Sequence, residues 1–301
     1  MINSYGGPAR YQFMLDSEQQ MKYYALNSLK IDFTINENGK FDLNFLTGAK
    51  FLHQTLFCIY SFFQHLSKAE KREFSVTVFD DGSLSPENIS CINTHFPGIH
   101  IIAYQESIAT INAVLPKDKF PFIHKKANEL FFFNKILFLH TQGRKGLKIY
   151  MDADMLFFRR PVEILDWLYK HHQSNTATFA LEDIKISYGY TSDIIQNIIP
   201  NCTIQKINAG LYAMHTHIID YNYLEDKIRE IDESYGSSYY MEQLITYLLL
   251  TQHDQLTLLP IEKYIVFPTE EEVRHPKGTL HHYVDLSKYS YLTTAWKLII
   301  R

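Results

Sequence analysis

The chain has 301 residues, of which 46% are hydrophobic and 21% charged, a composition typical of a globular protein with a substantial core. The net charge of −4 and the lack of a long basic block make nucleic acid a poor candidate partner. Aromatic content is high, with 21 Tyr and 21 Phe. Most of these rings are expected in the core, but some can line a binding cleft, because ring faces suit sugars and bases.

The three cysteines, Cys58, Cys91 and Cys202, are odd in number and far apart. They offer neither a full disulfide framework nor a CxxC metal site, and they fit a reducing compartment. No apolar run resembling a signal peptide stands at the N-terminus, and the longest apolar stretch, residues 56–63, falls far short of the roughly 20 residues that span a bilayer. We therefore predict a cytoplasmic protein without a transmembrane segment, for which peripheral membrane contact stays open.

The first half of the chain predicts alternating strands and helices. Residues 1–40 are polar and predict an N-terminal extension with a helix near residues 18–29. The alternation in residues 41–47 predicts a strand, and apolar residues at helical spacing predict a buried helix over 50–66. Further along we predict a strand at 74–79, a helix at 86–96, a strand at 100–104 and helices over 125–140.

The second half continues this pattern. After a loop at Gly143–Gly146, strands are predicted at 147–151, 176–181, 207–215 (with a break at Gly210) and 256–259. Helices are predicted at 161–169, 217–233 and 239–251, irregular chain at 182–206 and an exposed loop at 269–279.

This alternation predicts an α/β fold in one domain, residues 41–301, with a mixed, mostly parallel sheet flanked by helices. Ligands of such sheets bind at the carboxyl ends of the strands. The residues that directly follow each strand are therefore the candidates for a site.

The strongest of these candidates is Asp152-Ala153-Asp154, after the apolar strand LKIYM. Two residues apart on a strand, the carboxylates face the same way and repel each other unless a cation lies between them. Oxygen ligands suit Mg²⁺ or Mn²⁺, and such a cation can neutralise a diphosphate leaving group. The simpler reading is a solvated acidic turn, because a lone DxD is common.

Four further groups are weaker when taken alone. Asn208 could bond sugar hydroxyls while Gly210 lets a ligand approach the backbone, but the same residues suit a β-bulge. Glu242-Gln243 could be ordinary helix-start chemistry, and His281-His282 could be exposed in a tail. His282 could equally complete a metal site, and Lys288 could meet phosphate charge. Asp80-Asp81 could bond a base or ribose or form a plain Asx turn.

In their order along the chain, these motifs resemble those of nucleotide-sugar glycosyltransferases of the GT-A fold. The likeness is greatest to family 8, the retaining enzymes of the glycogenin and bacterial galactosyltransferase type. The resemblance spans roughly residues 41–290 and rests on the residues that match the family pattern: Lys135 upstream of YMDADMLFF, Asn208, Glu242-Gln243 where the family has Asp-Gln, and His282 with Lys288. The family's Gly is replaced by Asp285, and its Pro-Trp by Tyr289-Ser290.

The resemblance implies transfer of a hexose from a nucleotide-sugar, with UDP as the expected nucleotide and retention at the anomeric carbon. It implies that Asp152, Asp154 and His282 hold Mn²⁺ or Mg²⁺ and that Lys288 adds charge at the diphosphate. The remaining implied roles are base and ribose contacts for Thr47, Phe51, Asp80 and Asp81, sugar contacts for Lys135, Asn208, Gly210 and Glu242, and charge stabilisation beneath the anomeric carbon for Gln243.

The acceptor, whether glycan, lipid or protein, is not indicated, although residues 182–206 and 269–279 are the expected acceptor-facing or closing segments. Two alternatives remain. One is a degenerate domain that binds a nucleotide-sugar without transfer, which the replaced Gly and Pro-Trp favour. The other is a DxD phosphohydrolase, whose pattern wants Thr or Val where this chain has Leu156.

Overall fold

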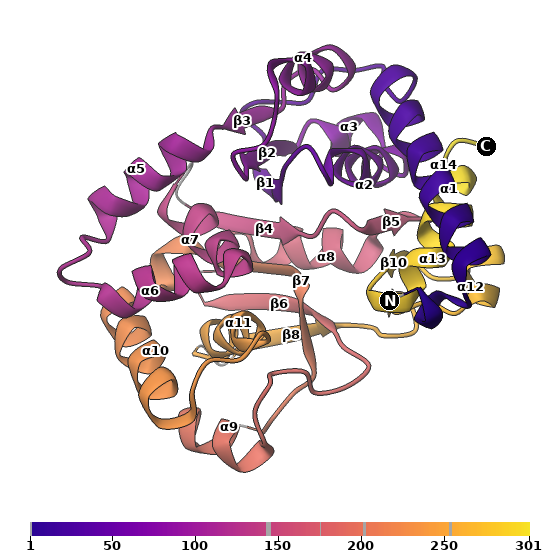
Figure 1. Ribbon diagram of the computed structural model, residues 1–301. Helices are drawn as coiled ribbons and strands as arrows, with labels where there is room; N and C mark the ends of the chain where they lie inside the picture. Colours follow the sequence, from indigo (N-terminus) through magenta and orange to yellow (C-terminus); the bar gives the residue numbers. More distant parts are fainter. Residues whose placement is uncertain (1, 143–145, 175, 201–202, 253–254) are drawn as a thin grey trace. The chain divides into compact units, whose positions relative to one another are not determined.

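The computed structural model describes residues 2–142, 146–174, 176–200, 203–252 and 255–301 (Figure 1). Part of the predicted Gly143–Gly146 loop and Cys202 lie outside these residues. The chain forms two compact units, which are described one at a time. The first unit comprises Met1–Ile101, Met151–Tyr169 and Pro260–Arg301, and the second comprises Ile102–Tyr150 and Lys170–Leu259.

The first unit holds strands β3, β2 and β1, adjacent in that order, and a small sheet in the order β5-β10-β9. Strands β1 and β2 are parallel, with Thr47 opposite Asp80 at their carboxyl ends. The strands of this unit are β1 (Phe41–Thr47), β2 (Phe74–Asp80), β3 (mainly here, His100–Ile102), β5 (Met155–Phe157), β9 (Tyr264–Val266) and β10 (Leu280–His282). Its helices are η1 (Asn3–Tyr5), α1 (Pro8–Asn27), α2 (Leu52–Gln64), α3 (Lys68–Lys71), α4 (Pro86–His95), α8 (mainly here, Val162–His171), α12 (Glu270–Arg274), η4 (Asp285–Ser287), α13 (Lys288–Ser290), the π-helical η5 (Tyr291–Ala295) and α14 (Trp296–Ile299).

The core of the first unit is aromatic. The sequence of β2, FSVTVFD, is buried along its whole length, as expected for a strand covered on both faces. The Phe62 ring on α2 packs edge-on against Phe74 at 5.0 Å and against Phe157 at 5.1 Å between ring centroids. These contacts join β2, α2 and β5, so this part of the aromatic surplus lies in the core.

The N-terminal helix belongs to this unit. Met14, Met21 and Ala25 of α1 are buried, and the helix contacts α2 and η5. In Figure 1 the indigo α1 lies beside the yellow C-terminal helices, so the two ends of the sequence pack together. The helix is longer than the predicted span of 18–29, because Pro8 at its first turn pre-sets the helical φ.

The second unit holds β4, β7, β6 and β8, adjacent in that order. Strands β6 and β8 are parallel, and β6 and β7 are antiparallel. Its strands are β4 (mainly here, Leu147–Met151), β6 (Ala177–Glu182), β7 (Ile207–His215) and β8 (Gln255–Leu259). Its helices are α5 (Tyr104–Val114), α6 (Pro121–Glu129), η2 (Phe131–Phe133), α7 (Asn134–Thr141), α9 (Ser192–Ile198), η3 (Thr216–Ile218), α10 (Tyr221–Tyr235) and α11 (Met241–Thr251).

Several expectations are wrong in detail. Residues 269–279 are not simply an exposed loop, since they form α12, which begins with a capping box of Thr269 and Glu272 and buries Val273. Residues 182–206 include α9. Strand β7 is not broken at Gly210; its pairing with β6 shifts between Ala180 and Leu181, so a bulge takes the place of the break.

The burial of two histidines and the length of the helices bear on two of the sequence predictions. His281 and His282 are 0% and 2% exposed in β10, which excludes an exposed tail. Among the described residues, no helix is long and apolar enough to cross a membrane. Cys58 and Cys91 are free thiols, of which Cys58 is fully buried.

Candidate functional site

The site candidate in the first unit begins at the end of β4. Asp152 and Asp154 lie in the turn between β4 and β5, and not on the strand itself as the two-residue spacing suggested. Their orientation therefore comes from this turn, which a hydrogen bond from Tyr283 N to Asp154 O (2.9 Å) fixes against β10.

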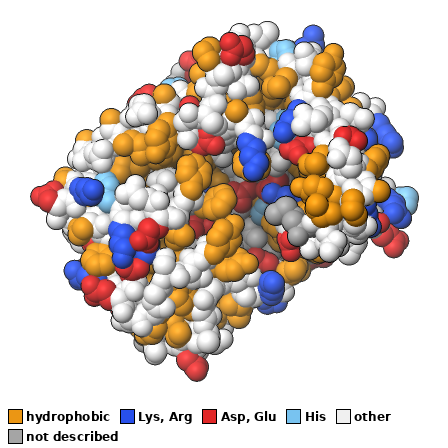
Figure 2. Space-filling model, viewed as in Figure 1, with side chains coloured by type: hydrophobic (Ala, Val, Ile, Leu, Met, Phe, Trp, Pro, Cys, Tyr) orange, Lys and Arg blue, Asp and Glu red, His pale blue; other side chains and the backbone are white. Residues whose placement is uncertain are grey.

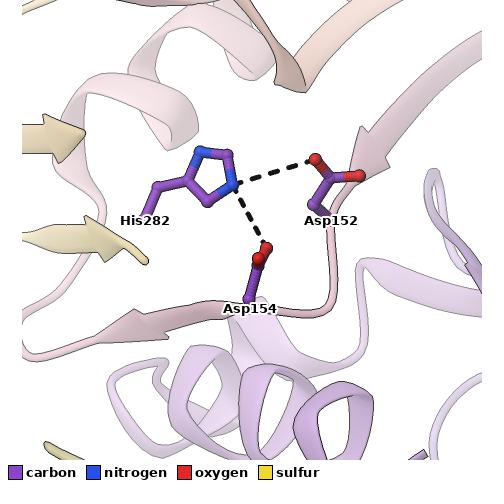
Figure 3. Close-up of side chains that lie close together, drawn as sticks. All are labelled: Asp152, Asp154 and His282. Atoms are coloured by element: carbon purple, nitrogen blue, oxygen red, sulfur yellow. Dashed lines mark hydrogen bonds and ion pairs between the residues drawn. The ribbon is translucent and has the colours of Figure 1, made fainter. Parts of the chain in front are cut away.

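Strand pairing supplies the third member. Strand β10 runs antiparallel to β5 and pairs His282 with Met155, which brings the imidazole beside the two carboxylates. His282 Nε2 lies 3.1 Å from Asp154 Oδ1 and 3.8 Å from Asp152 Oδ2 (Figure 3). One ligand atom from each of the three residues falls within 4.8 Å of the others. Residues that are 128 positions apart thus form one compact cluster.

This donor set fits a divalent cation. Two carboxylates offer the oxygen ligands that Mg²⁺ and Mn²⁺ prefer, and an imidazole nitrogen is better suited to Mn²⁺ than to Mg²⁺. The side chain of Asp152 is 32% exposed, that of Asp154 14% and that of His282 2%, so the cluster is anchored inside and open on the Asp152 side. His282 Nδ1 is buried without a hydrogen-bond partner among the described residues. The ring is therefore held by packing and by the two carboxylates.

Lys288 completes the cluster electrostatically. Its Nζ lies 3.0 Å from Asp154 Oδ2. Burial would raise the pKa of Asp154, but Lys288 and His282 outweigh it and hold that pKa well below its usual range. Burial likewise opposes the charge on Lys288, yet Asp154 and Asp152 raise its pKa. Asp154 is thus an anion held by two basic groups, and an ammonium stands beside the cation-binding candidates.

Two turns lie at the carboxyl ends of β1 and β2 in the same unit. Asp81 N donates to Thr47 O (2.9 Å), and Ala49 N donates to Ser83 Oγ (2.9 Å), so the two turns are joined. A Cβ on Gly48 would stand 2.0 Å from Asp81 Oδ1, so the Asp81 carboxyl group packs directly against this glycine. The turns therefore form one rigid edge after the two parallel strands.

The predicted base and ribose contacts all belong to this edge. Asp80 Oδ1 accepts from Gly82 N, Ser83 N and Leu84 N at 2.9–3.2 Å, which is the Asx turn considered from the sequence. Thr47 is 2% exposed and its hydroxyl accepts from Thr55 (2.8 Å). The Phe51 ring lies 5.9 Å from Lys288 Nζ, so the turn reaches the ammonium of the cation cluster.

A second polar cluster lies within the second unit. Lys135 Nζ on α7 contacts Glu242 Oε1 on α11 (2.9 Å) and donates to Ala209 O on β7 (3.0 Å). Lys135 is 5% exposed, and its ion pair is therefore mostly desolvated. Three segments singled out separately in the sequence meet here.

Asn208 and its neighbours extend this cluster. Asn208 Nδ2 donates to Asp183 Oδ2 (3.0 Å), and Gly210 N donates to Asn208 Oδ1 (2.9 Å). Sequence reasoning missed Asp183, although it directly follows β6 and the rule that singled out Asp80 applies to it equally. Gln243 Nε2 donates to Ser187 O (3.1 Å), which joins α11 to the loop after β6.

Comparisons with known proteins bear on the fold. No protein-family model matches the sequence, and no curated protein matches it. Among solved structures, apo mouse xyloside xylosyltransferase 1 aligns with 80% of this chain and 96% of its own, at 9% identity and a TM-score of 0.55. An active-site mutant of LgtC aligns with 81% and 87%, at 14% identity and a TM-score of 0.54. The bifunctional glycosyltransferase WbbM aligns with 91% of this chain and 52% of its own, at 13% identity and a TM-score of 0.51.

These likenesses confirm the predicted fold class, a mixed α/β fold of the GT-A type with helices flanking the sheet. At such low identities they establish the fold alone, since one fold serves many functions.

Proposed function

We propose that the protein is a metal-dependent glycosyltransferase that takes a hexose from a nucleotide-sugar. The observation that carries the proposal is the cluster of Asp152, Asp154 and His282 with Lys288 beside it, formed after β4 of a fold that solved glycosyltransferases share. A solvated acidic turn would not require a buried histidine and a partly buried lysine against it.

The cluster's task is to manage the charge of a diphosphate. Bound to Asp152, Asp154 and His282, Mn²⁺ or Mg²⁺ would neutralise the negative charge that develops on the leaving diphosphate. Lys288 supplies a second, permanent positive charge, which Asp154 holds in place at 3.0 Å. Such preorganised charge lowers the barrier without having to reorganise during the reaction.

UDP is the nucleotide proposed for the rigid edge after β1 and β2. Phe51 offers a ring face near Lys288, and Thr47, Asp80 and Asp81 offer polar atoms within the two joined turns. The support is the rigidity of this edge, because a preformed site loses little entropy on binding.

Sugar contacts are proposed for the polar cluster of the second unit. Lys135 and Glu242 hold each other, and Asn208 is held by Asp183, so these side chains are preorganised. Gln243 is proposed to stabilise positive charge at the anomeric carbon, with retention of configuration. The fixed amide orientation from its bond to Ser187 O supports this role.

The degenerate-binder alternative is weakened by one observation. Asp285, which replaces the family's Gly, has φ +46°, the left-handed conformation that favours glycine. The loop therefore keeps a glycine-like backbone despite the replacement. A cytoplasmic location remains the prediction of the cysteine content.

Thermal melting with UDP, GDP and CMP, each with and without Mn²⁺, tests the proposed function. A ligand at about 100 times its Kd stabilises the folded state by about 2.7 kcal/mol, which raises the Tm of a protein of this size by about 5 °C. We expect such a shift with UDP and Mn²⁺ together, and neither UDP alone nor Mn²⁺ alone should produce it in full.

Asp152→Asn is the variant of choice, because Asp152 is the most exposed of the three residues and Asp154 also holds Lys288. It should lose the metal-dependent shift while melting normally without ligand. The exposed Asp118→Asn is the matched control and should keep the shift. The proposal fails if no nucleotide gives a metal-dependent shift, or if Asp152→Asn keeps it.

A further inference from the structure

The second unit carries a row of four exposed aromatic side chains, here called the aromatic row: Phe131, Phe132, Tyr239 and Tyr240. They are 44%, 52%, 69% and 48% exposed. Large apolar side chains that are exposed next to one another often mark an interaction site. Successive rings touch edge-on, with centroids 6.2, 6.2 and 5.2 Å apart and planes inclined at 73°, 82° and 88°. No ring in the row is stacked flat upon the next.

The row rests on a rigid base. Lys126 is 0% exposed and forms ion pairs with Glu129 and Asp232. Its Nζ also donates to Ser237 Oγ (3.1 Å). This buried ammonium joins α6, which leads to Phe131 and Phe132, to the segment that carries Tyr239 and Tyr240. The segments that carry the exposed rings are thus tied together, which lowers the entropy cost of ordering these segments on binding.

Tyr240 also lines an adjoining groove of about 600 Å³, here called the tyrosine groove. That volume is typical of a small-molecule site. The tyrosine groove lies between residues 185–191 and residues 235–240, and its lining also includes Ile194. The two sides are locked together, because the Tyr190 hydroxyl donates to Gly236 O (2.7 Å) and a Cβ on Gly189 would stand 1.9 Å from Ser238 Oγ.

The chemistry of the tyrosine groove suits a neutral polyhydroxyl ligand. Its lining offers hydroxyls from Ser, Thr and Tyr side chains, and Lys185 is the one charged residue in that lining. The C–H faces of sugar rings stack on the negative faces of aromatic rings, and hydroxyl groups exchange hydrogen bonds with sugar hydroxyls. On the face shown in Figure 2, hydrophobic side chains lie in separate groups among polar ones.

The tyrosine groove adjoins the proposed reaction machinery. Ser187 lines the groove, and its carbonyl oxygen holds the side chain of Gln243, the residue proposed to act at the anomeric carbon. Tyr240 precedes Gln243 by three residues, so one end of the aromatic row meets the start of α11.

From this arrangement we infer that the tyrosine groove and the aromatic row bind the acceptor, and that the acceptor is a neutral carbohydrate chain of several sugar units. The acceptor role rests on the proposed function, whereas carbohydrate binding does not. The tyrosine groove takes the end of the chain, and the aromatic row takes the sugar units that follow.

Native gel electrophoresis through gels containing soluble polysaccharides tests the binding. The probes are glycogen, dextran, arabinoxylan, galactomannan and mixed-linkage β-glucan. The wild type should be retarded by at least one of them relative to a gel without polysaccharide. Phe132→Ala/Tyr239→Ala should bind that polysaccharide at least about fivefold more weakly, because each lost ring contact is worth a factor of a few. Both rings are exposed, so this variant should fold, which its melting curve verifies.

Tyr23→Ala is the matched control, since it removes a ring that is 71% exposed on α1 and should leave the retardation unchanged. Retardation by none of the five polysaccharides, or equal retardation of wild type and double variant, would overturn the inference. Sedimentation with neutral phosphatidylcholine vesicles that the double variant loses would also overturn it in favour of a lipid surface.

Release of UDP from UDP-glucose and UDP-galactose by the wild type separates the two proposals. If UDP release depends on metal but no polysaccharide retards the protein, the proposed function stands and the inference fails. Retardation that depends on the aromatic row, without any nucleotide binding or release, would support a carbohydrate site and overturn its role as an acceptor site.

Discussion

At the scale of single residues, Asp285 shows how a backbone conformation survives a change of side chain. Its φ of +46° lies in the left-handed region, where asparagine and aspartate are the least costly residues after glycine. The residue stands three positions before Lys288, so its conformation sets the direction of the chain towards the cation cluster.

Substitutions at Asp285 should therefore separate by backbone preference. Asp285→Gly should leave the free energy of unfolding nearly unchanged, and Asp285→Val should lower it by about 1–2 kcal/mol, because a β-branched residue resists positive φ. Urea unfolding of the two variants measures the difference. Equal losses in both would mean that the carboxylate of Asp285, and not its backbone, maintains the loop.

At the scale of elements, α3 is a helix of one turn that depends on its cap. Ser67 and Glu70 form a capping box, and Glu70 also pairs with Arg160 at 2.5 Å. The hydrogen bond from Arg160 lowers the pKa of Glu70 to about 2. Since this pKa lies below the ordinary value, Glu70 stabilises the fold above about pH 4.5, and the contribution is lost as the pH falls towards 2.

Glu70→Gln should accordingly destabilise the protein at pH 6 and much less at pH 3. Urea unfolding at both pH values measures the two differences, with the exposed Glu106→Gln as control. Glutamine also serves a capping box, so the cap should persist in this variant. An equal loss at both pH values would therefore mean that the charge of Glu70 does not carry the effect.

Elements with clear periodicity were predictable from the sequence, and the rest show why periodicity has limits. Strands β1 and β7 and helix α2 lie within a few residues of their predicted spans. Strands of three residues, such as β5, β9 and β10, are too short to show alternation, and so the small sheet was not predicted. The capping box that begins α12 is present in the sequence, but the polar residues around it predict an exposed loop.

The candidate site was predictable in part for the same reason. Asp152 and Asp154 follow a strand, and a rule of strand ends finds them. His282 is buried beside them because β10 pairs with β5, and no local sequence pattern indicates that pairing. The roles of individual residues came from resemblance to a family, and they stay predictions until they are tested.

At the scale of the whole molecule, the cluster of Asp152, Asp154 and His282 belongs to the first unit, and so does the rigid edge after β1 and β2. This unit is assembled from three separate stretches of sequence. UDP with Mn²⁺ should therefore slow hydrogen exchange mainly in residues 41–101, 151–169 and 260–301. Binding suppresses local opening most strongly where the ligand makes contact.

Hydrogen exchange followed by mass spectrometry, with and without UDP and Mn²⁺, measures this pattern. Asp152→Asn under the same conditions should show no added protection. Protection concentrated in residues 102–150 and 170–259 would contradict the assignment of UDP to the first unit.

The separation of 128 residues between Asp154 and His282 has a consequence during protein synthesis. At the usual 5–20 residues per second, the ribosome delivers His282 on the order of ten seconds after Asp154. Until then the nascent chain carries two neighbouring carboxylates without their imidazole or ammonium partners. The growing polypeptide must therefore fold around an incomplete site, and its cation-binding chemistry can begin only after His282 has been made.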